Sequence, residues 1–170
     1  MTDLLDYARP SAVEVESVAL EPVLRQAVEA ARLDPTFGGA AEQVQLELPE
    51  ALPFIDTDPT LLRRALVNLL VNALQNVDEG GRVALTANVD EQDLYIRVYN
   101  DGPTIAPEVA VRVFEPFFTT RASGTGLGLA VVHRIASDLG GAVRLEPGGP
   151  SGTTFLLRLP VQLATAFAAR

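Results

Sequence analysis

The chain has 170 residues, of which 48% are hydrophobic and 21% are charged, and this is enough to bury the core of a single domain. Its formal net charge of -9 argues against a surface for nucleic acid or anionic membranes, because both are bound through clusters of Lys and Arg. The absence of cysteine excludes disulfides and zinc–thiolate sites. No apolar run is long enough to span a membrane and no signal-peptide pattern is present, so we expect a cytoplasmic protein without direct membrane contact.

The first half of the chain alternates between helical and strand-like patterns. Residues 1–8 have helical spacing that Pro10 ends, and we interpret them as the end of a helix. A long helix is predicted over 58–77, since Asp58 and Pro59 are favoured as its N-cap and first residue. The other expected elements are a strand at 13–20, a helix with Val23, Leu24, Ala27, Ala30 and Ala31 on one side, a loop at Gly38 and Gly39, and short strands at 44–48 and 53–55. The core stripe of the long helix is formed by Leu62, Leu66, Leu69, Leu70 and Ala73.

The second half of the chain predicts a hairpin, a second long helix and a final pair of strands. The helix is expected over 127–139 and is closed by Gly140 and Gly141. Strands are expected at 82–89, 94–99, 142–145 and 154–159, with turns at 90–93 and 148–152 and a tail at 162–170. These elements predict an α/β (α+β) sandwich, in which a mixed, mostly antiparallel sheet of about five strands is covered on one face by about three helices.

Three glycines at alternate positions, Gly124, Gly126 and Gly128, precede the second long helix. Glycine lets the backbone approach a ligand closely, and the free N–H groups of a helix N-terminus face an anion, so the segment 124–129 is a candidate phosphate cradle. The alternative is a tight turn that caps a core helix. A Walker loop and the loop of eukaryotic-type protein kinases are both excluded, because each needs a lysine and this chain has none.

The helix at 58–77 carries Asn68, Asn72 and Asn76 at intervals of four residues, so that all three lie along one face. Asparagine favours helices less than alanine does, so such a line needs a reason. One reason is a solvent-facing side with a buried, hydrogen-bonded amide. The other is an amide oxygen that binds Mg²⁺, a cation that prefers oxygen ligands and bridges to phosphates.

Three other polar features are weaker indications of a binding or catalytic site. The segment 100–105, beginning Asn-Asp-Gly-Pro, places an acceptor at a strand end and could equally be an ordinary turn. Arg121 is the best side-chain candidate for a phosphate contact. His133 falls outside the apolar stripe of its helix, and with one histidine and no cysteine, a catalytic triad or a histidine-rich metal site is not supported.

Taken in order, these segments resemble the catalytic and ATP-binding domain of bacterial sensor histidine kinases, within the superfamily of Bergerat-type ATPases that includes the gyrase ATPase subunit. The matching boxes are the N box at 68–73, the G1 box at 100–104, the F box at 114–118, the G2 box at 124–129 and a last glycine box at 152–155. Residues 4–10 also resemble the end of the family's dimerisation hairpin. The resemblance implies a hairpin end and linker at 1–11, an ATP-binding domain at 12–161 and a C-terminal tail at 162–170.

The resemblance also implies roles for individual residues. Asn72 would coordinate Mg²⁺, Gln75 and Asn68 would lie beside the phosphates, and Asn100 and Gly102 would meet adenine. Residues 119–123 would form a short ATP lid. The full set expected around ATP or ADP is Asn68, Asn72, Gln75, Asn76, Asn100, Gly102, Thr104, Ile105, Phe118, Thr119, Thr120, Arg121, Gly124, Thr125, Gly126, Leu127, Gly128, Leu129 and Thr154.

The chemistry implied is transfer of the γ-phosphoryl group of ATP to a histidine, with this domain supplying position and charge neutralisation. The implied partners are the dimerisation and histidine phosphotransfer domain of the same kinase and the receiver domain of a response regulator. No segment here matches the phosphoacceptor histidine, so we do not expect autophosphorylation by this chain alone, and no residue of the chain is expected to be catalytic in itself.

The chain departs from the family pattern at three positions. Asn100 stands where the family has an adenine-reading aspartate, and a neutral acceptor makes a weaker bond than a charged one, so affinity is expected to fall. Thr104 replaces the second glycine of the G1 box. Asn68 stands where gyrase-like ATPases have a water-activating glutamate, which argues against efficient ATP hydrolysis.

Two other functions fit the same resemblance. The chain could be a degenerate, non-catalytic relative that docks a partner protein, which Asn100 and Thr104 favour and which the intact G2 box and Asn72 disfavour. It could also be a serine kinase of the anti-sigma type from the same superfamily.

Overall fold

The computed structural model describes residues 12–34, 44–77, 80–121, 124–146 and 152–162. Several predicted features lie outside the described residues, namely the helix end at 1–8, the loop at 38–39, the turn at 148–151 and the tail at 163–170.

Helices and strands follow one another along the described chain as the sequence predicts. In order they are β1 Glu16–Ala19, α2 Leu20–Arg32, β2 Val44–Glu47, β3 Phe54–Thr57, α3 Pro59–Gln75, β4 Val83–Val89, β5 Asp93–Asn100, α4 Pro107–Ala110, α5 Gly128–Asp138, β6 Ala142–Leu145 and β7 Thr153–Pro160. Only α4, a helix of four residues, was not predicted. A single turn offers too little periodicity to be recognised in a sequence.

The strands form two sheets. Five strands lie in the order β2-β4-β5-β7-β6, and β1 pairs with β3 in a separate two-stranded sheet. The β2–β4 pair is parallel, whereas the other three pairs of the large sheet are antiparallel. The predicted mixed, mostly antiparallel sheet of five strands is thus confirmed.

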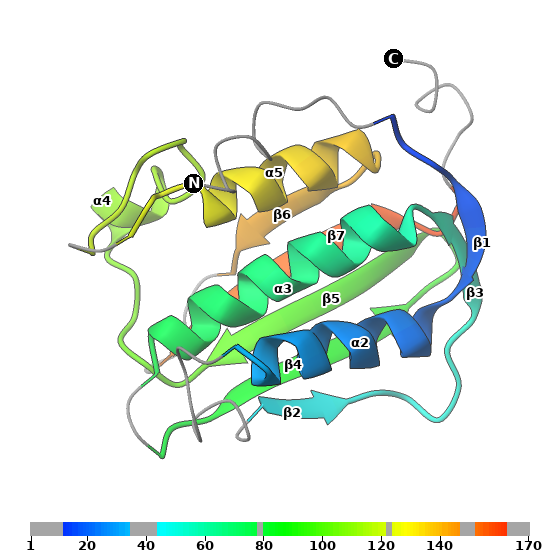
Figure 1. Ribbon diagram of the computed structural model, residues 1–170, viewed down its shortest axis with the longest axis horizontal. Coiled ribbons are helices and arrows are strands. Elements are labelled where there is room, and N and C mark those ends of the chain that lie inside the picture. Colours follow the sequence, from blue (N-terminus) through cyan, green and yellow to red (C-terminus); the bar gives the residue numbers. More distant parts are fainter. Residues whose placement is uncertain (1–11, 35–43, 78–79, 122–123, 147–151, 163–170) are drawn as a thin grey trace.

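The three long helices α2, α3 and α5 cover one face of the large sheet, with α3 between the other two (Figure 1). The predicted core stripe of α3 is fully buried, and on α2 the buried set contains Val28 in place of the predicted Ala30. These apolar faces pack on the inward side chains of β4, β5 and β7, such as Leu85, Ile96 and Phe155. No described helix combines the length and apolarity needed to cross a membrane.

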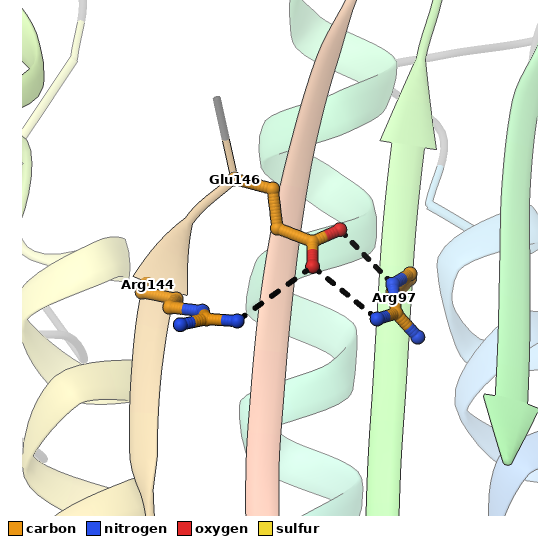
Figure 2. Close-up of polar contacts among 3 residues, drawn as sticks. All are labelled: Arg97, Arg144 and Glu146. Carbon is orange, nitrogen blue, oxygen red and sulfur yellow. Dashed lines mark hydrogen bonds and ion pairs between the residues drawn. The ribbon is translucent and has the colours of Figure 1, made fainter. Parts of the chain in front are cut away.

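The opposite face of the sheet carries a group of charged side chains (Figure 2). Arg97 on β5 donates to both carboxylate oxygens of Glu146, at 2.9 and 3.3 Å, and Arg144 on β6 lies 4.0 Å from the same carboxylate. In the strand register, Leu156 of β7 lies between Arg97 and Arg144, and it is only 2% exposed. We infer that the stems of these charged side chains shield Leu156 on the face that the helices leave open.

Asp58, which lies between β3 and α3, accepts three hydrogen bonds through its side chain. One carboxylate oxygen accepts from the backbone N–H groups of Thr60 and Leu61, both at 3.0 Å, as expected of an N-cap. The other accepts from the backbone N–H of Glu14 at 2.9 Å. Because Asp58 is only 5% exposed, water cannot easily replace these bonds. The bond to Glu14 also ties the segment that precedes β1 to the start of α3.

We predict that Asp58→Ala lowers the free energy of unfolding by about 2–3 kcal/mol, since a helix cap and a further buried acceptor are lost together. Asp58→Asn is the matched variant. It keeps an oxygen for the helix cap but places an N–H group opposite Glu14, so its loss is expected to be about 1 kcal/mol. Urea denaturation of the three proteins measures both values, and equal losses for the two variants would contradict the account.

Candidate functional site

Three contacts bring the predicted motifs together around α3. At its C-terminal end, Gly102 packs against the carbonyl of Asn76, and Arg121 donates to the side chain and the carbonyl of Gln75. Two turns earlier, the side-chain oxygen of Asn68 lies 3.3 Å from the position that a Cβ would occupy on Gly128. The segment after β5, the segment before α5 and the start of α5 are therefore all adjacent to the asparagine-bearing face of α3.

The predicted line of asparagines on α3 is half-buried, and two of its amides bond to the helix itself. The side-chain nitrogen of Asn68 donates to the carbonyl of Arg64 at 2.9 Å, and that of Asn76 donates to the carbonyl of Asn72 at 2.6 Å. With their nitrogens engaged, Asn68 and Asn76 present their oxygens as acceptors. In the described part of the chain no group of His, Cys, Asp and Glu side chains is suited to a metal, so a cation here would depend on amide oxygens and on its own ligand.

Asn100 ends β5 as a buried polar residue. It lies between Val83 and Thr153 in the sheet and is only 1% exposed. Its side-chain nitrogen is fully buried and has no hydrogen-bond partner, the only such case among the side chains that the structure describes. An unpaired buried donor costs about 1–3 kcal/mol, so this amide would gain from a partner that the described residues do not supply.

The segment after Asn100 is fixed by two close contacts. A side chain at Gly102 would overlap the carbonyl oxygen of Asn76, so only glycine allows the segment to lie directly on the end of α3. The hydroxyl of Thr153 donates to the carbonyl of Pro103 at 3.2 Å. Beyond these contacts Thr104 is exposed, and Ile105 is half-buried against the core.

The register of β7 distinguishes between its two threonines. Thr153 pairs with Asn100, and Thr154 pairs with Tyr99, so the two side chains point to opposite faces of the sheet. Thr153 is buried on the face of Asn100, whereas Thr154 is half-buried on the other face. The predicted Thr154 therefore lies on the opposite face of the sheet from Asn100, whereas Thr153 lies on the same face. Adjacent threonines in a sequence carry no signal of register, and the one-residue difference is visible only once the strands are paired.

The F box and the G2 box pack backbone against backbone. Gly126 adopts a φ of +67°, and its carbonyl accepts from the N–H of Phe117 at 2.9 Å. A Cβ on Gly126 would lie 2.5 Å from the carbonyl carbon of Phe117, which itself has a φ of 66°. Gly126 is thus required both for its conformation and for this contact.

The phenylalanines of the F box have different environments. Phe114 is half-buried and meets Phe155 edge to face with ring centroids 6.0 Å apart, while Phe117 is 63% exposed. The half-buried Phe118 stacks under the guanidinium of Arg112 at 4.3 Å from the ring centroid. His133 is exposed beside Phe114, with ring centroids 5.8 Å apart, as its helical position predicts.

Side chains of the predicted lid bond to its own backbone and to α3. The hydroxyl of Thr119 accepts from the N–H of Arg121 at 3.1 Å, and Thr120 is exposed. Burial lowers the pKa of Arg121, whose guanidinium is engaged by Gln75. For Arg121 to bind an anion, it must exchange these bonds for new ones.

No side chain caps the start of α5, so its first backbone N–H groups can donate to an acceptor. Leu127 occupies the N-cap position and forms no side-chain cap, so the first N–H groups of the helix, at Gly128 and Leu129, are not satisfied by a capping side chain. The hydroxyl of Thr125 accepts from the N–H of Leu127 at 3.4 Å. A helix of 11 residues with this N-terminus has the donors and the dipole that favour an anion.

We predict that Gly126→Ala lowers the free energy of unfolding by about 2 kcal/mol or more, because it adds steric overlap to a left-handed backbone. Gly80→Ala is the matched control. Gly80 has a φ of +84° but no atom within 4 Å of its Cβ position, so only the backbone penalty of about 1 kcal/mol is expected there. Guanidinium denaturation of both variants tests the contact, and equal losses would show that the F box does not restrict Gly126.

The sequence is similar to proteins of one family. The family model described as "Histidine kinase-, DNA gyrase B-, and HSP90-like ATPase" matches residues 57–163. Sensor histidine kinase ZraS of Escherichia coli K12 is 33% identical over 165 residues, which cover 96% of this chain and 35% of that protein. Sporulation kinase E of Bacillus subtilis is 29% identical over 95% of this chain and 22% of its own length. The chain thus spans about a third or less of the length of these relatives.

Solved structures share the same fold. Full-length ShkA in complex with AMPPNP superposes with a TM-score of 0.80 at 32% identity, over 96% of this chain and 35% of that one. The mycobacterial sensor histidine kinase MprB gives a TM-score of 0.72 at 29% identity, over 88% of this chain and 100% of that one. Since the family model matches more than half of its residues and the fold agrees, the chain belongs to the family of histidine kinase-, DNA gyrase B- and HSP90-like ATPases.

Proposed function

We propose that this chain is the ATP-binding catalytic domain of a sensor histidine kinase, at residues 12–161, and that it binds Mg-ATP between α3 and the N-terminal end of α5. The observation that carries the proposal is the convergence, among the described residues, of three features that suit a ligand. They are the amide oxygens along α3, the buried nitrogen of Asn100 and the uncapped start of α5. Relatives named as sensor histidine kinases, and one structure in complex with the ATP analogue AMPPNP, support the same reading.

The residues present fit a magnesium-bound triphosphate. Mg²⁺ takes oxygen ligands and keeps contacts to substrate phosphates, and Asn72 lies in the middle of the asparagine face. Asn68 and Gln75 flank it on the same helix, and the N–H groups of Gly128 and Leu129 begin the neighbouring helix. We infer that Asn72 binds the metal while the α5 N-terminus and Arg121 bind phosphate oxygens.

The base would lie at the C-terminal end of α3, beside Asn100. There the glycine at 102 keeps the segment close to the helix, and Thr153 holds that segment through Pro103. Asn100 then has a ligand for its unpaired amide, and Ile105 offers apolar surface at the edge of the core.

Bound Mg-ATP would supply the γ-phosphoryl group, and the chain would hold it in position and neutralise its charge. His133, the one histidine, packs beside Phe114 on the exposed side of α5, so we propose that the phosphoryl acceptor belongs to a dimerisation domain of the same kinase. A receiver domain of a response regulator would then take the phosphoryl group. We also propose a cytoplasmic location, because ATP is available there.

Titration calorimetry with Mg-ATP and Mg-ADP tests the proposal directly. Binding below millimolar concentration is expected. Undetectable binding at millimolar nucleotide would instead favour a docking module that keeps only the fold.

We predict that Asn72→Ala weakens Mg-ADP binding at least about tenfold, which corresponds to about 1.4 kcal/mol, because the metal loses its protein ligand. Binding of ADP in the presence of a chelator should change little. The control is Asn88→Ala, since Asn88 is exposed on β4 and lies off the core face. If Asn72→Ala binds Mg-ADP as tightly as the parent chain, the metal assignment is wrong.

We also predict that Asn100→Asp tightens Mg-ADP binding by about 1 kcal/mol, roughly fivefold, because a charged acceptor bonds the adenine amine more strongly than a neutral one. Calorimetry measures this difference, and thermal unfolding checks that the buried carboxylate is tolerated. Weaker binding by a folded Asn100→Asp variant would assign the amide another role.

A further inference from the structure

The nature of the unpaired group at Asn100 bears on which purine base the site accepts. A carboxylate at this position would present only acceptors, whereas an amide presents one oxygen acceptor and one NH₂ donor. In the structure the donor end is the buried end without a partner. A site that selected the 6-amino group of adenine alone would need an acceptor there.

The two classes of purine differ at this edge. Adenine has a 6-amino donor beside the N1 acceptor, while hypoxanthine and guanine have a 6-oxo acceptor beside an N1–H donor. A carboxylate facing a 6-oxo group would leave two acceptors opposed, which a buried site rejects strongly. An amide can pair with either edge, because a rotation of 180° exchanges its oxygen and its NH₂ group.

Among the described residues, no hydrogen bond holds the side-chain nitrogen of Asn100 in place. Its near neighbour is Gly102, whose Cβ position lies 2.9 Å from the nitrogen, so a larger residue there would compete for the space. The strand pairs of Asn100 with Val83 and Thr153 fix its backbone but use only main-chain groups.

We propose that Asn100 makes the base site tolerant at position 6 of the purine, so that the chain binds 6-oxo purine nucleotides, of the inosine and guanosine type, nearly as well as adenine nucleotides. This inference rests on the proposed function, since it assumes that the base lies beside Asn100. It makes Asn100 a specificity-determining residue whose identity sets the range of substrates.

The test is calorimetry of the 170-residue chain with Mg-ADP and Mg-IDP, because the two bases differ only in the groups at positions 6 and 1. For the parent chain we expect the ratio of the Kd for IDP to that for ADP to be below about 5, and for Asn100→Asp we expect it to rise at least about tenfold. Asn88→Asp is the matched control, since it adds the same charge on an exposed part of β4 and should leave the ratio unchanged.

A parent ratio above about 30, or an equal ratio in the parent and in folded Asn100→Asp, would overturn the inference. Asn100→Ala provides a second variant, in which both nucleotides should weaken together and the ratio should stay near that of the parent. If Asn100→Asp does not fold, the parent ratio decides. A parent chain that binds ADP but excludes IDP refutes only the base tolerance, whereas a chain that binds neither refutes the proposed function as well.

Discussion

The contact between Gly102 and the carbonyl of Asn76 is the constraint on which the candidate site depends. It is a backbone-to-backbone contact that no residue with a side chain could make, and it joins the end of β5 to the end of α3. Through it, the buried amide of Asn100 comes to lie at the same end of the molecule as the asparagine face of α3. Gly126 plays the corresponding part on the other side, where it fits the F box against the segment that leads into α5. Both contacts are steric, so the arrangement of the site follows from where side chains are missing.

The charges of the chain also limit how it could bind a polyphosphate. With a net charge of -9 and no lysine, the chain cannot rely on a basic surface. Neutral groups could bind the polyphosphate and its metal instead. They are amide oxygens suited to a hard cation and helix N–H groups suited to an anion. The guanidinium of Arg121 bonds to Gln75, which keeps it at the end of α3.

The parts of the fold that depend on local patterns were predictable from the sequence. Asp58 and Pro59 mark the start of α3, and the spacing of its leucines gives its buried face. Long-range pairing was not predictable, since nothing local indicates that β2 pairs parallel to β4 or that β1 and β3 form their own sheet. For the same reason the candidate site was predicted as a set of motifs, but the faces on which Thr153 and Thr154 lie required the strand register. The unpaired nitrogen of Asn100 could not be predicted either, because it depends on burial by distant segments.

The most direct test of the account is a crystal structure of the chain grown with saturating Mg-ADP. The account predicts the metal at about 2.0–2.1 Å from the side-chain oxygen of Asn72, with phosphate oxygens at the first N–H groups of α5 and the base at Asn100. Nucleotide bound elsewhere, or well-ordered crystals in which side chains fill the space between Asn72 and the start of α5, would contradict it.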